Sequence, residues 1–243
     1  MNLVIDQGNT ICKIAVFDVE DEPVKVYTST SLSASFLKGI LDEFKPMAGI
    51  LSSVTEVNKG IIELLGERLS YFNRLSHATP IPINNAYKTP ETLGMDRLAA
   101  AVGAWSICPG KPLLIVDMGT AITYDLVSEE GVYLGGNIAP GLTLRLKALH
   151  DHTGRLPEVV ASDNFKSFGI DTESAIRAGV MQGIVYEANG YINEYKEMFQ
   201  GLFAFLTGGD LIYFAGKLKN GFFVSRNLVL IGLNRILNYN VCK

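Results

Sequence analysis

The sequence predicts an α/β protein built from two similar halves, because one pattern occurs twice and both halves share an order of elements. Residues 3–18 read LVIDQGNTICKIAVFD, and residues 114–129 read LIVDMGTAITYDLVSE. In both halves the expected strands come first and the helices follow, which is typical of a layered α/β fold. We therefore expect two duplicated domains, residues 1–111 and 112–243, each a mixed sheet flanked by helices.

Each copy of the repeated pattern predicts a hairpin whose turn can face a ligand. An apolar run indicates a buried strand, and Gly8 or Gly119 allows the tight reversal before an antiparallel partner strand. At such a turn, Asp, Asn and Thr side chains can point at a ligand while backbone N–H groups line an anion-binding concavity. A single Asp-x-Gly turn usually marks a plain hairpin. Two copies in matching positions predict two phosphate-facing turns across a cleft.

The rest of the first half alternates between strand and helix patterns. Strands are expected at residues 3–5, 13–18, 24–28, 49–54 and 72–75, and helices at residues 33–44 and 58–69. Ser33 is a suitable N-cap for the first helix, whose apolar residues recur at helical spacing. The polar, proline-rich residues 80–90 predict a surface loop. We expect Thr89 to cap the next helix, with Pro90 at its first position.

The second half repeats this layout and adds one long helix. Strands are expected at residues 113–117, 121–127, 132–138 and 203–207, helices at residues 143–150 and 172–199, and a last apolar segment at residues 228–237. The helix over residues 172–199 would span about 42 Å. Gly179 and Gly183 lie one turn apart on it, where another backbone could approach closely. That backbone could belong to a partner subunit or to the same domain.

Composition excludes several classes of protein. Of the 243 residues, 48% are hydrophobic, enough for a sizeable core, and the net charge of −4 includes no basic stripe for nucleic acid. The longest apolar runs, such as Leu113–Val116, are too short to span a bilayer. Asp6 interrupts any apolar run that a signal peptide would need. We expect a soluble cytoplasmic protein with no nucleic-acid or membrane partner.

Cysteine and histidine are sparse and widely spaced. Cys12, Cys108 and Cys242 form no Cys-x-x-Cys pair, which argues against a disulfide framework and for a reducing compartment. His150 and His152 would point apart on a helix, so we expect surface or interface residues there and not a metal site.

Further motifs follow the first turn in a fixed order. They are Tyr87 with Pro90-Glu91, Gly94-Met95-Asp96-Arg97, Asp117-Met118-Gly119-Thr120, Gly135-Gly136 with Ile138-x-Pro140-Gly141, Thr172 ahead of Ala175-Ile176 and Gly179, Thr207-Gly208-Gly209-Asp210, and Leu228-Val229-Leu230-x-Gly232-Leu233. Together with the opening turn, they make the chain resemble the type III pantothenate kinases of the actin, sugar-kinase and Hsp70 superfamily. The resemblance covers residues 3–233. It implies two ribonuclease-H-like (actin-like ATPase) domains.

The resemblance also implies an activity and a set of site residues. The family phosphorylates pantothenate to 4′-phosphopantothenate with ATP, the first step of coenzyme A biosynthesis, and is homodimeric. By this resemblance ATP is bound by Asp6, Gln7, Gly8, Asn9, Thr10, Ile11, Cys12, Lys13 and Thr120. Pantothenate is bound by Tyr87, Gly94, Met95, Asp96, Arg97 and Thr172. Asp117 is assigned to a monovalent cation, potassium or ammonium, and magnesium accompanies ATP.

Phosphoryl transfer explains why these residue types are needed. The phosphates need charge neutralisation, which Lys13 can supply, and the attacking hydroxyl needs a base, for which Asp96 is the candidate. Arg97 could hold either the pantothenate carboxylate or the transferring phosphoryl group. The Gly208-Gly209 turn would let adenosine lie close to the backbone.

Each of these assignments has an ordinary structural alternative. Asp96 could be a helix cap, Lys13 a solvated strand residue and Asp117 a turn acceptor. Tyr87 could simply pack in its loop, and Thr172 could begin a helix.

Two rival functions come from related proteins. One is a non-catalytic transcriptional accessory protein, against which the acidic and basic residues of the kinase motifs argue. The other is a kinase that acts on a sugar, against which Tyr87 and the Gly94–Arg97 motif argue.

Overall fold

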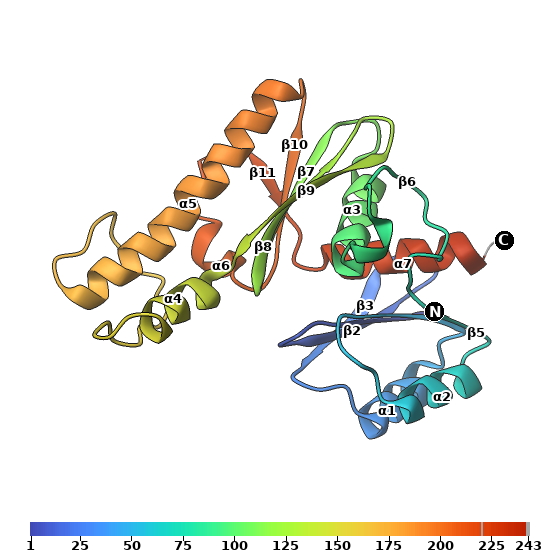
Figure 1. Ribbon diagram of the computed structural model, residues 1–243. Coiled ribbons are helices and arrows are strands. Elements are labelled where there is room, and N and C mark those ends of the chain that lie inside the picture. The colour runs from blue at the N-terminus through green and yellow to red at the C-terminus, as the bar shows by residue number, and fades with distance from the viewer. Residues whose placement is uncertain (220, 242–243) are drawn as a thin grey trace. The chain divides into compact units, whose positions relative to one another are not determined.

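The computed structural model describes residues 1–219 and 221–241, and the chain forms two compact units (Figure 1). The first unit comprises Met1–Gly110, Gly131–Leu134 and the segment from Asn227 onward, and the second comprises Lys111–Glu130 and Gly135–Arg226. The first division lies next to the expected boundary between residues 111 and 112. The C-terminal segment groups with the first unit, so one boundary does not describe both units. Cys242 lies outside the described residues.

The first unit contains a mixed five-stranded sheet. Its strands are β1 (Asn2–Gln7), β2 (Cys12–Phe17), β3 (Pro23–Ser29), β4 (Ala48–Ser53) and β5 (Tyr71–Arg74), in the order β3-β2-β1-β4-β5. The first three strands pair antiparallel, whereas β4 runs parallel to both β1 and β5. The five strands expected in the first half are therefore confirmed.

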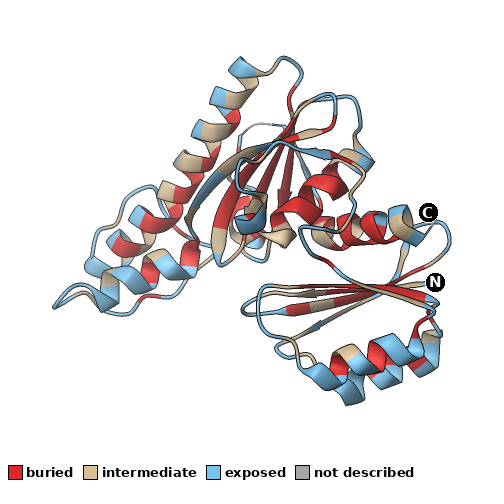
Figure 2. Cartoon of the chain, turned by 45° about the vertical axis from the view of Figure 1, so that its right-hand side comes forward, coloured by how far each residue is buried: buried red, intermediate tan, exposed pale blue. Residues whose placement is uncertain are grey.

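Helices cover this sheet on both faces (Figure 2). On one face α1 (Ala34–Phe44) and α2 (Lys59–Arg68) bury apolar residues such as Leu37 and Leu65 against β1, β2 and β4. Ser33 caps α1 as expected, because its hydroxyl accepts a hydrogen bond from the Phe36 amide at 3.3 Å. On the other side, α3 (Met95–Ile107) packs tightly on α7 (Leu228–Val241), and α7 also contacts β1, β2 and β4.

The second unit repeats the sheet order of the first. Its strands are β7 (Leu113–Met118), β8 (Ala121–Val127), β9 (Val132–Pro140), β10 (Phe203–Thr207) and β11 (Phe222–Val224), in the order β11-β10-β7-β8-β9. β7 pairs antiparallel with β8 and parallel with β10, as β1 does with β2 and β4. The predicted duplication is thus present in strand order and direction. A two-residue strand, β6 (Asn84–Asn85), pairs with the first residues of β9, which belong to the first unit.

Three helices accompany the second sheet: α4 (Leu142–Asp151), α5 (Thr172–Met198) and α6 (Leu211–Phe214). Buried residues of α5, including Ile184, Ala188 and Ile192, pack against β7, β8 and β10 to form the core of this unit. Asp171 is the N-cap of α5, and Asp171 and Ser174 form a reciprocal capping box. Among the described residues, no helix is both long enough and apolar enough to cross a membrane.

One expected helix start is wrong. Pro90–Thr92 form only a short 3₁₀ turn, and Thr89 makes no capping hydrogen bond through its side chain. Leu93 and Gly94 are extended, and Gly94 is the N-cap from which α3 begins at Met95. Pro90 does begin a helical turn, but the extended residues that follow prevent it from joining α3.

Gly232 allows α7 to lie against α3. A Cβ atom at Gly232 would stand 1.8 Å from the Ala99 carbonyl oxygen, so no larger residue fits without moving a helix. We expect Gly232→Ala to lower the free energy of unfolding by roughly 1–3 kcal/mol or more, the usual cost of overpacking. Gly66→Ala is the matched control, because a Cβ there meets nothing within 4 Å and Gly66 lies inside α2. This control should stabilise by about 0.4–1 kcal/mol. Urea denaturation of both variants measures the difference, and equal stabilities would contradict the packing argument.

Candidate functional site

The first repeated turn joins β1 to β2. Asp6 lies near the end of β1, opposite Lys13 on β2 and beside Ser52 on the parallel strand β4. The Gly8 amide donates to the Ile11 carbonyl at 3.0 Å, which closes the turn. Asn9, Thr10 and Ile11 are exposed at its tip, while Cys12 is buried. The turn therefore presents backbone and polar side chains to solvent, as the sequence predicts.

The second repeated turn has the same construction between β7 and β8. Asp117 lies opposite Thr123 on β8 and beside Thr207 on the parallel strand β10. The Gly119 amide donates to the Ala121 carbonyl at 3.1 Å, and Thr120 is exposed. Each sheet thus ends its first strand with an aspartate next to a hydroxyl-bearing residue.

Two glycines from other motifs lie against the backbone of the second turn. Gly208 has a φ of +100°, and a Cβ there would lie 2.3 Å from the Met118 carbonyl oxygen. A Cβ at Gly141 would lie 2.2 Å from the Gly119 carbonyl oxygen and 2.4 Å from that of Thr120. Only glycine allows such close backbone contact. These contacts hold the backbone of the turn on two sides.

Asp96 lies in the first turn of α3, where the amide of Arg97 donates to its Oδ1 at 2.8 Å. A carboxylate at this position is favoured by the partial positive charge of the helix N-terminus. The local structure therefore holds Asp96 in place. Asp96 is not the cap of α3, because Gly94 holds that position, but its place in the first turn agrees with the structural alternative of a charge that favours the helix start.

The first unit brings Asp6 and Asp96 into electrostatic contact, although they are far apart in the sequence. The pKa of Asp6 is raised to about 7, first by burial and then by the negative charge of Asp96, while the positive charge of Lys13 lowers it. Two carboxyl groups and one ammonium group are therefore gathered at the end of β1. A buried acid with a raised pKa beside other charged groups is typical of functional sites.

Arg97 and Tyr87 join the same region of the first unit. Arg97 is buried, and its guanidinium carbon lies 6.0 Å from the centre of the Tyr87 ring, at the limit of a cation–π contact. The Tyr87 ring lies 6.1 Å from that of Tyr133, and its amide donates to Asn85 Oδ1 at 3.0 Å. The tyrosine and arginine predicted from distant motifs are thus neighbours.

The remaining predicted residues divide between the two units. Gly94 and Met95 precede Asp96 at the start of α3, in the first unit. Thr172 belongs to the second unit, where it is exposed as the first residue of α5. Its place at a helix start agrees with the structural alternative and leaves its hydroxyl accessible.

Metal binding can be assessed from the side chains present. Within residues 1–219 and 221–241, no group of three or more His, Cys, Asp or Glu side chains is arranged to hold a metal. A cation at Asp117 would therefore take its other ligands from backbone carbonyls, water or the nucleotide. An oxygen-only set of this kind fits a hard cation.

Sequence reasoning missed two features of the site. Ser52 lies beside Asp6, is 1% exposed, and its Oγ has no hydrogen-bond partner among the described residues. Its position could have indicated it, because Ser52 follows the apolar run of β4 just as Thr207 follows the apolar run of β10. The second feature is an ion pair, Arg145 with Glu187, behind the second turn. Nothing in the sequence pattern indicated it.

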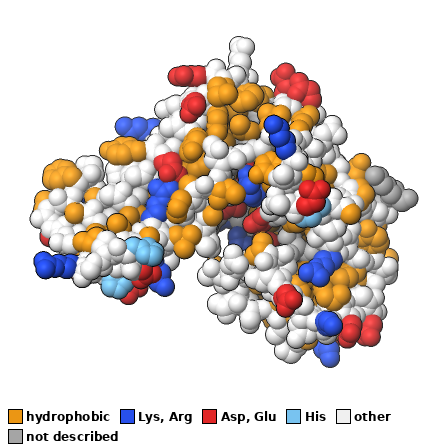
Figure 3. All heavy atoms as spheres, viewed as in Figure 1, with side chains coloured by type: hydrophobic (Ala, Val, Ile, Leu, Met, Phe, Trp, Pro, Cys, Tyr) orange, Lys and Arg blue, Asp and Glu red, His pale blue; other side chains and the backbone are white. Residues whose placement is uncertain are grey.

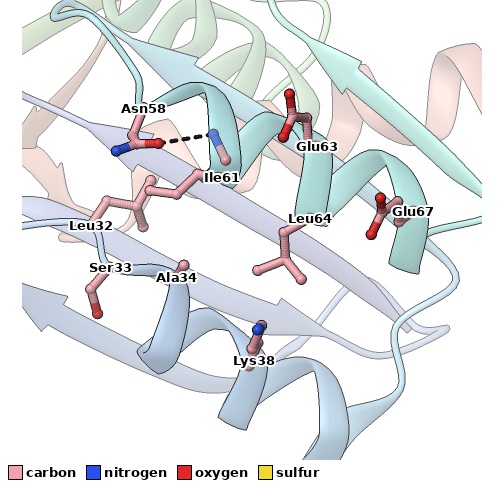
Figure 4. Close-up of a pocket in the computed structure, with 10 residues that line it drawn as sticks. Leu32, Ser33, Ala34, Lys38, Asn58, Ile61, Glu63, Leu64 and Glu67 are labelled. Carbon is pink, nitrogen blue, oxygen red and sulfur yellow. Dashed lines mark hydrogen bonds between the residues drawn. The ribbon is translucent and has the colours of Figure 1, made fainter.

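A groove of about 540 Å³ lies away from these residues, between α1 and α2 (Figure 4). Leu32, Ile61 and Leu64 line it together with charged residues, and Asn58 caps α2 at its edge with a hydrogen bond to the Gly60 amide. None of the residues predicted from the motifs lines this groove. The predicted residues lie elsewhere, at the first repeated turn and the start of α3 in the first unit, and at the second repeated turn and the start of α5 in the second.

Comparisons with known proteins agree with the motifs. A family model described as type III pantothenate kinase matches residues 2–194. A type III pantothenate kinase of Azobacteroides pseudotrichonymphae is 48% identical over 98% of this chain and 97% of its own length. One from Bacteroides fragilis is 48% identical over 99% of this chain and 98% of its own length.

Solved structures resemble the fold at lower identity. A protein of Campylobacter jejuni, described as a Baf family transcriptional activator, has a TM-score of 0.62 and 24% identity over 99% of this chain and all of its own. A 2-dehydro-3-deoxygalactonokinase structure from Sinorhizobium meliloti has a TM-score of 0.62 and 10% identity over 99% of each chain. At these identities the likeness concerns the fold, and it agrees with the expected duplicated ribonuclease-H-like architecture.

The raised pKa of Asp6 predicts a pH-dependent cost to stability. Between about pH 4 and pH 7 the folded chain keeps a proton on Asp6 that the unfolded chain has released, so the free energy of unfolding falls as pH rises. Asp6→Asn stays neutral and should therefore have the higher melting temperature at pH 8 but not at pH 4. Each kcal/mol gained corresponds to about 2–4 °C.

Differential scanning calorimetry without nucleotide measures this effect. Asp163→Asn, on an exposed loop, is the control and should change the melting temperature little at either pH. A shift for Asp6→Asn that is the same at pH 4 and pH 8 would rule out the electrostatic cause.

Proposed function

Because this chain belongs to the type III pantothenate kinase family, we propose that it phosphorylates pantothenate to 4′-phosphopantothenate with ATP, the first step of coenzyme A biosynthesis. The observation that carries the proposal is the cluster of Asp6, Asp96, Arg97 and Tyr87 in the first unit. These are the residue types that phosphoryl transfer to an alcohol requires.

ATP would be held mainly by the two repeated turns. The backbone amides and polar side chains of residues 6–13 would bind its phosphates, with Lys13 contributing a positive charge. Thr120, exposed on the second turn, would add a hydroxyl contact. Catalysis of this reaction consists largely of positioning and charge stabilisation, so rigid turns suit it.

Asp96 would act as the general base. Its carboxylate would accept the proton of the primary hydroxyl of pantothenate as that oxygen attacks the γ-phosphorus and ADP leaves. Gly94, Met95 and Thr172 would help to bind pantothenate. Arg97 lies over Tyr87, within the substrate-binding group, which favours a contact with the pantothenate carboxylate over one with the phosphoryl group.

Cations would assist at two points. Asp117 would bind a monovalent cation, potassium or ammonium, and magnesium would enter with ATP. Either cation would neutralise charge on the phosphates. The half-buried carboxylate of Asp117, at the end of β7 and beside Thr207, supports this assignment.

We also propose a homodimer formed through α5, in the cytoplasm. Gly179, Gly183, Tyr186 and Gly190 recur at spacings of four, three and four residues, so they share one face of the helix. Added Cβ atoms at the three glycines meet nothing within 4 Å, and Tyr186 is 64% exposed. Within residues 1–219 and 221–241, this face therefore has no close packing partner at the three glycines. Figure 3 shows exposed hydrophobic side chains over the part of the second unit that carries α4 and α5.

The two rival functions are not favoured. The structures with transcriptional or sugar-kinase descriptions share no more than 24% identity with this chain, which speaks for the fold alone. The gathering of Asp6, Lys13 and Asp96 has a direct use in a kinase, which a non-catalytic accessory protein would not need.

The kinase proposal is tested by substituting the proposed base. We expect Asp96→Asn to lower kcat by about 10²–10⁴-fold with pantothenate, because general-base catalysis typically contributes that much. ADP release is measured with pantothenate and with a panel of sugars, and circular dichroism checks folding. Faster turnover of a sugar than of pantothenate would reject the proposed substrate. Unchanged turnover in a folded Asp96→Asn protein would reject the proposed base.

The dimer proposal is tested on the same strip of α5. Gly183→Leu would place a large side chain where two backbones should meet, and overpacking typically costs about 1–3 kcal/mol per contact. We expect a shift towards monomer, measured by light scattering after size exclusion. Gly39→Leu is the control, because Gly39 in α1 also has no neighbour within 4 Å of an added Cβ. A monomeric parent protein, or a Gly183→Leu protein that stays dimeric, would refute the assignment.

A further inference from the structure

An ion pair joins α4 to α5 behind the second turn. Arg145, in the first turns of α4, donates from Nη2 to both carboxylate oxygens of Glu187 on α5, at 3.0 and 2.8 Å. The two side chains are 20% and 28% exposed, so solvent screens the pair only partly. The proposed mechanism gives neither residue a role.

Arg145 also holds the chain that enters α4. Its Nε donates to the Pro140 carbonyl at 2.7 Å, at the last residue of β9. The next residue, Gly141, donates its amide to the Thr120 carbonyl at 3.1 Å and lies in backbone contact with Gly119. The Arg145 guanidinium therefore binds Pro140, and the next residue, Gly141, contacts the second turn.

Glu187 also accepts a hydrogen bond from a tyrosine. The Tyr124 hydroxyl donates to Glu187 Oε1 at 2.9 Å from a fully buried position on β8. Burial, and then the charge of Glu187, raise the pKa of Tyr124, so its hydroxyl stays a donor. The Tyr124 ring lies 4.2 Å from that of Tyr191, which lies 5.8 Å from that of Tyr195. The Oε1 atom of Glu187 thus accepts hydrogen bonds from both Tyr124 and Arg145.

We infer that Arg145 and Glu187 are positioning residues, which fix Pro140 and Gly141 and thereby hold the Gly119-Thr120 turn in the geometry that binds nucleotide. The inference rests on the proposed role of Thr120 in ATP binding. It adds a link between that turn and α5, because Glu187 follows Tyr186 of the exposed strip directly in sequence.

An ion pair that only stabilises the fold would behave differently. Loss of such an ion pair lowers the stability and the fraction of folded enzyme, but it leaves the nucleotide affinity of the folded molecules unchanged. Loss of a positioning contact weakens nucleotide binding selectively, because Thr120 and its turn shift while the pantothenate residues in the first unit do not.

The experiment compares Arg145→Met, Arg145→Lys and Glu187→Gln in the full chain. We expect Arg145→Met to raise the KM for ATP and the calorimetric Kd for ADP by about tenfold, the lower end of the loss seen when residues that orient metal ligands are removed. The KM for pantothenate should change by less than about twofold. Arg145→Lys can keep one donor and should recover part of the loss. Lys147→Met, on the exposed side of α4, is the control and should leave all three constants unchanged.

Three results would overturn the inference. One is a lower melting temperature in Arg145→Met with an unchanged Kd for ADP, which is expected of an ion pair that only stabilises the fold. Another is an equal rise in both KM values. If Arg145→Met does not fold, Glu187→Gln and Tyr124→Phe preserve shape and carry the same test, and an unchanged Kd in both would be decisive against it.

Thr120→Ala separates the inference from the proposed function. If Thr120→Ala weakens ADP binding but Arg145→Met does not, the turn binds nucleotide and the inference alone is wrong. If Thr120→Ala has no effect, the role of the turn in the proposed function is wrong, and the inference fails with it.

Discussion

The parallel pairing between the first and fourth strands of each sheet is the constraint on which the site depends. This register sets Asp6 beside Ser52 in the first unit and Asp117 beside Thr207 in the second. The pairing also directs these polar residues away from the face that carries the main apolar cluster, because Ile5 and Leu51, or Met118 and Leu206, occupy that face. A slip of one residue would exchange the two faces and bury the carboxylates in the core. The same few hydrogen bonds therefore stabilise the fold and position the site.

The electrostatics of the first unit show a conflict between stability and function. Asp6 is held in an environment that raises its pKa to about 7, close to the carboxyl group of Asp96. A neutral side chain would suit the fold better at neutral pH, but it would lack the charge that the proposed role of Asp6 at the ATP phosphates calls for. Such conflicts are usual where residues are selected for activity. The proximity of Lys13 reduces the cost without removing it.

Local patterns predicted the repeated hairpins, the strands and the long helix, because each depends on residues that are close in sequence. Ser33 was identified as an N-cap for the same reason, and its hydrogen bond is present. The helix start at Thr89 was wrong because capping residues cannot reveal that Leu93 and Gly94 become extended. The sequence did not predict the strands β6 and β11 or the helix α6, because segments of two to four residues are too short to show a periodic pattern.

Contacts between distant segments account for the rest of what the sequence did not reveal. The approach of Asp96 to Asp6 and the pairing of Arg145 with Glu187 depend on how whole elements pack. The motifs identified Gly141 and Gly208 as family features, but only the structure shows that both lie against the backbone of one turn. The motifs therefore gave candidate site residues, whereas the contacts that support those residues could not be predicted from sequence.

The return of α7 to the first unit has a consequence for how the chain is made. The sheet of β1 to β5 emerges early from the ribosome, yet its covering helix is encoded at the opposite end of the chain and arrives last. The second unit occupies a nearly continuous stretch, Lys111–Arg226 apart from four residues. All of its residues can therefore be synthesised while the first unit still lacks α7. Domains generally fold as units in order of synthesis. In this chain the residues of α7, which contact β1, β2 and β4, are synthesised after those of the second unit, so the first unit gains this contact later than the second unit gains its own core.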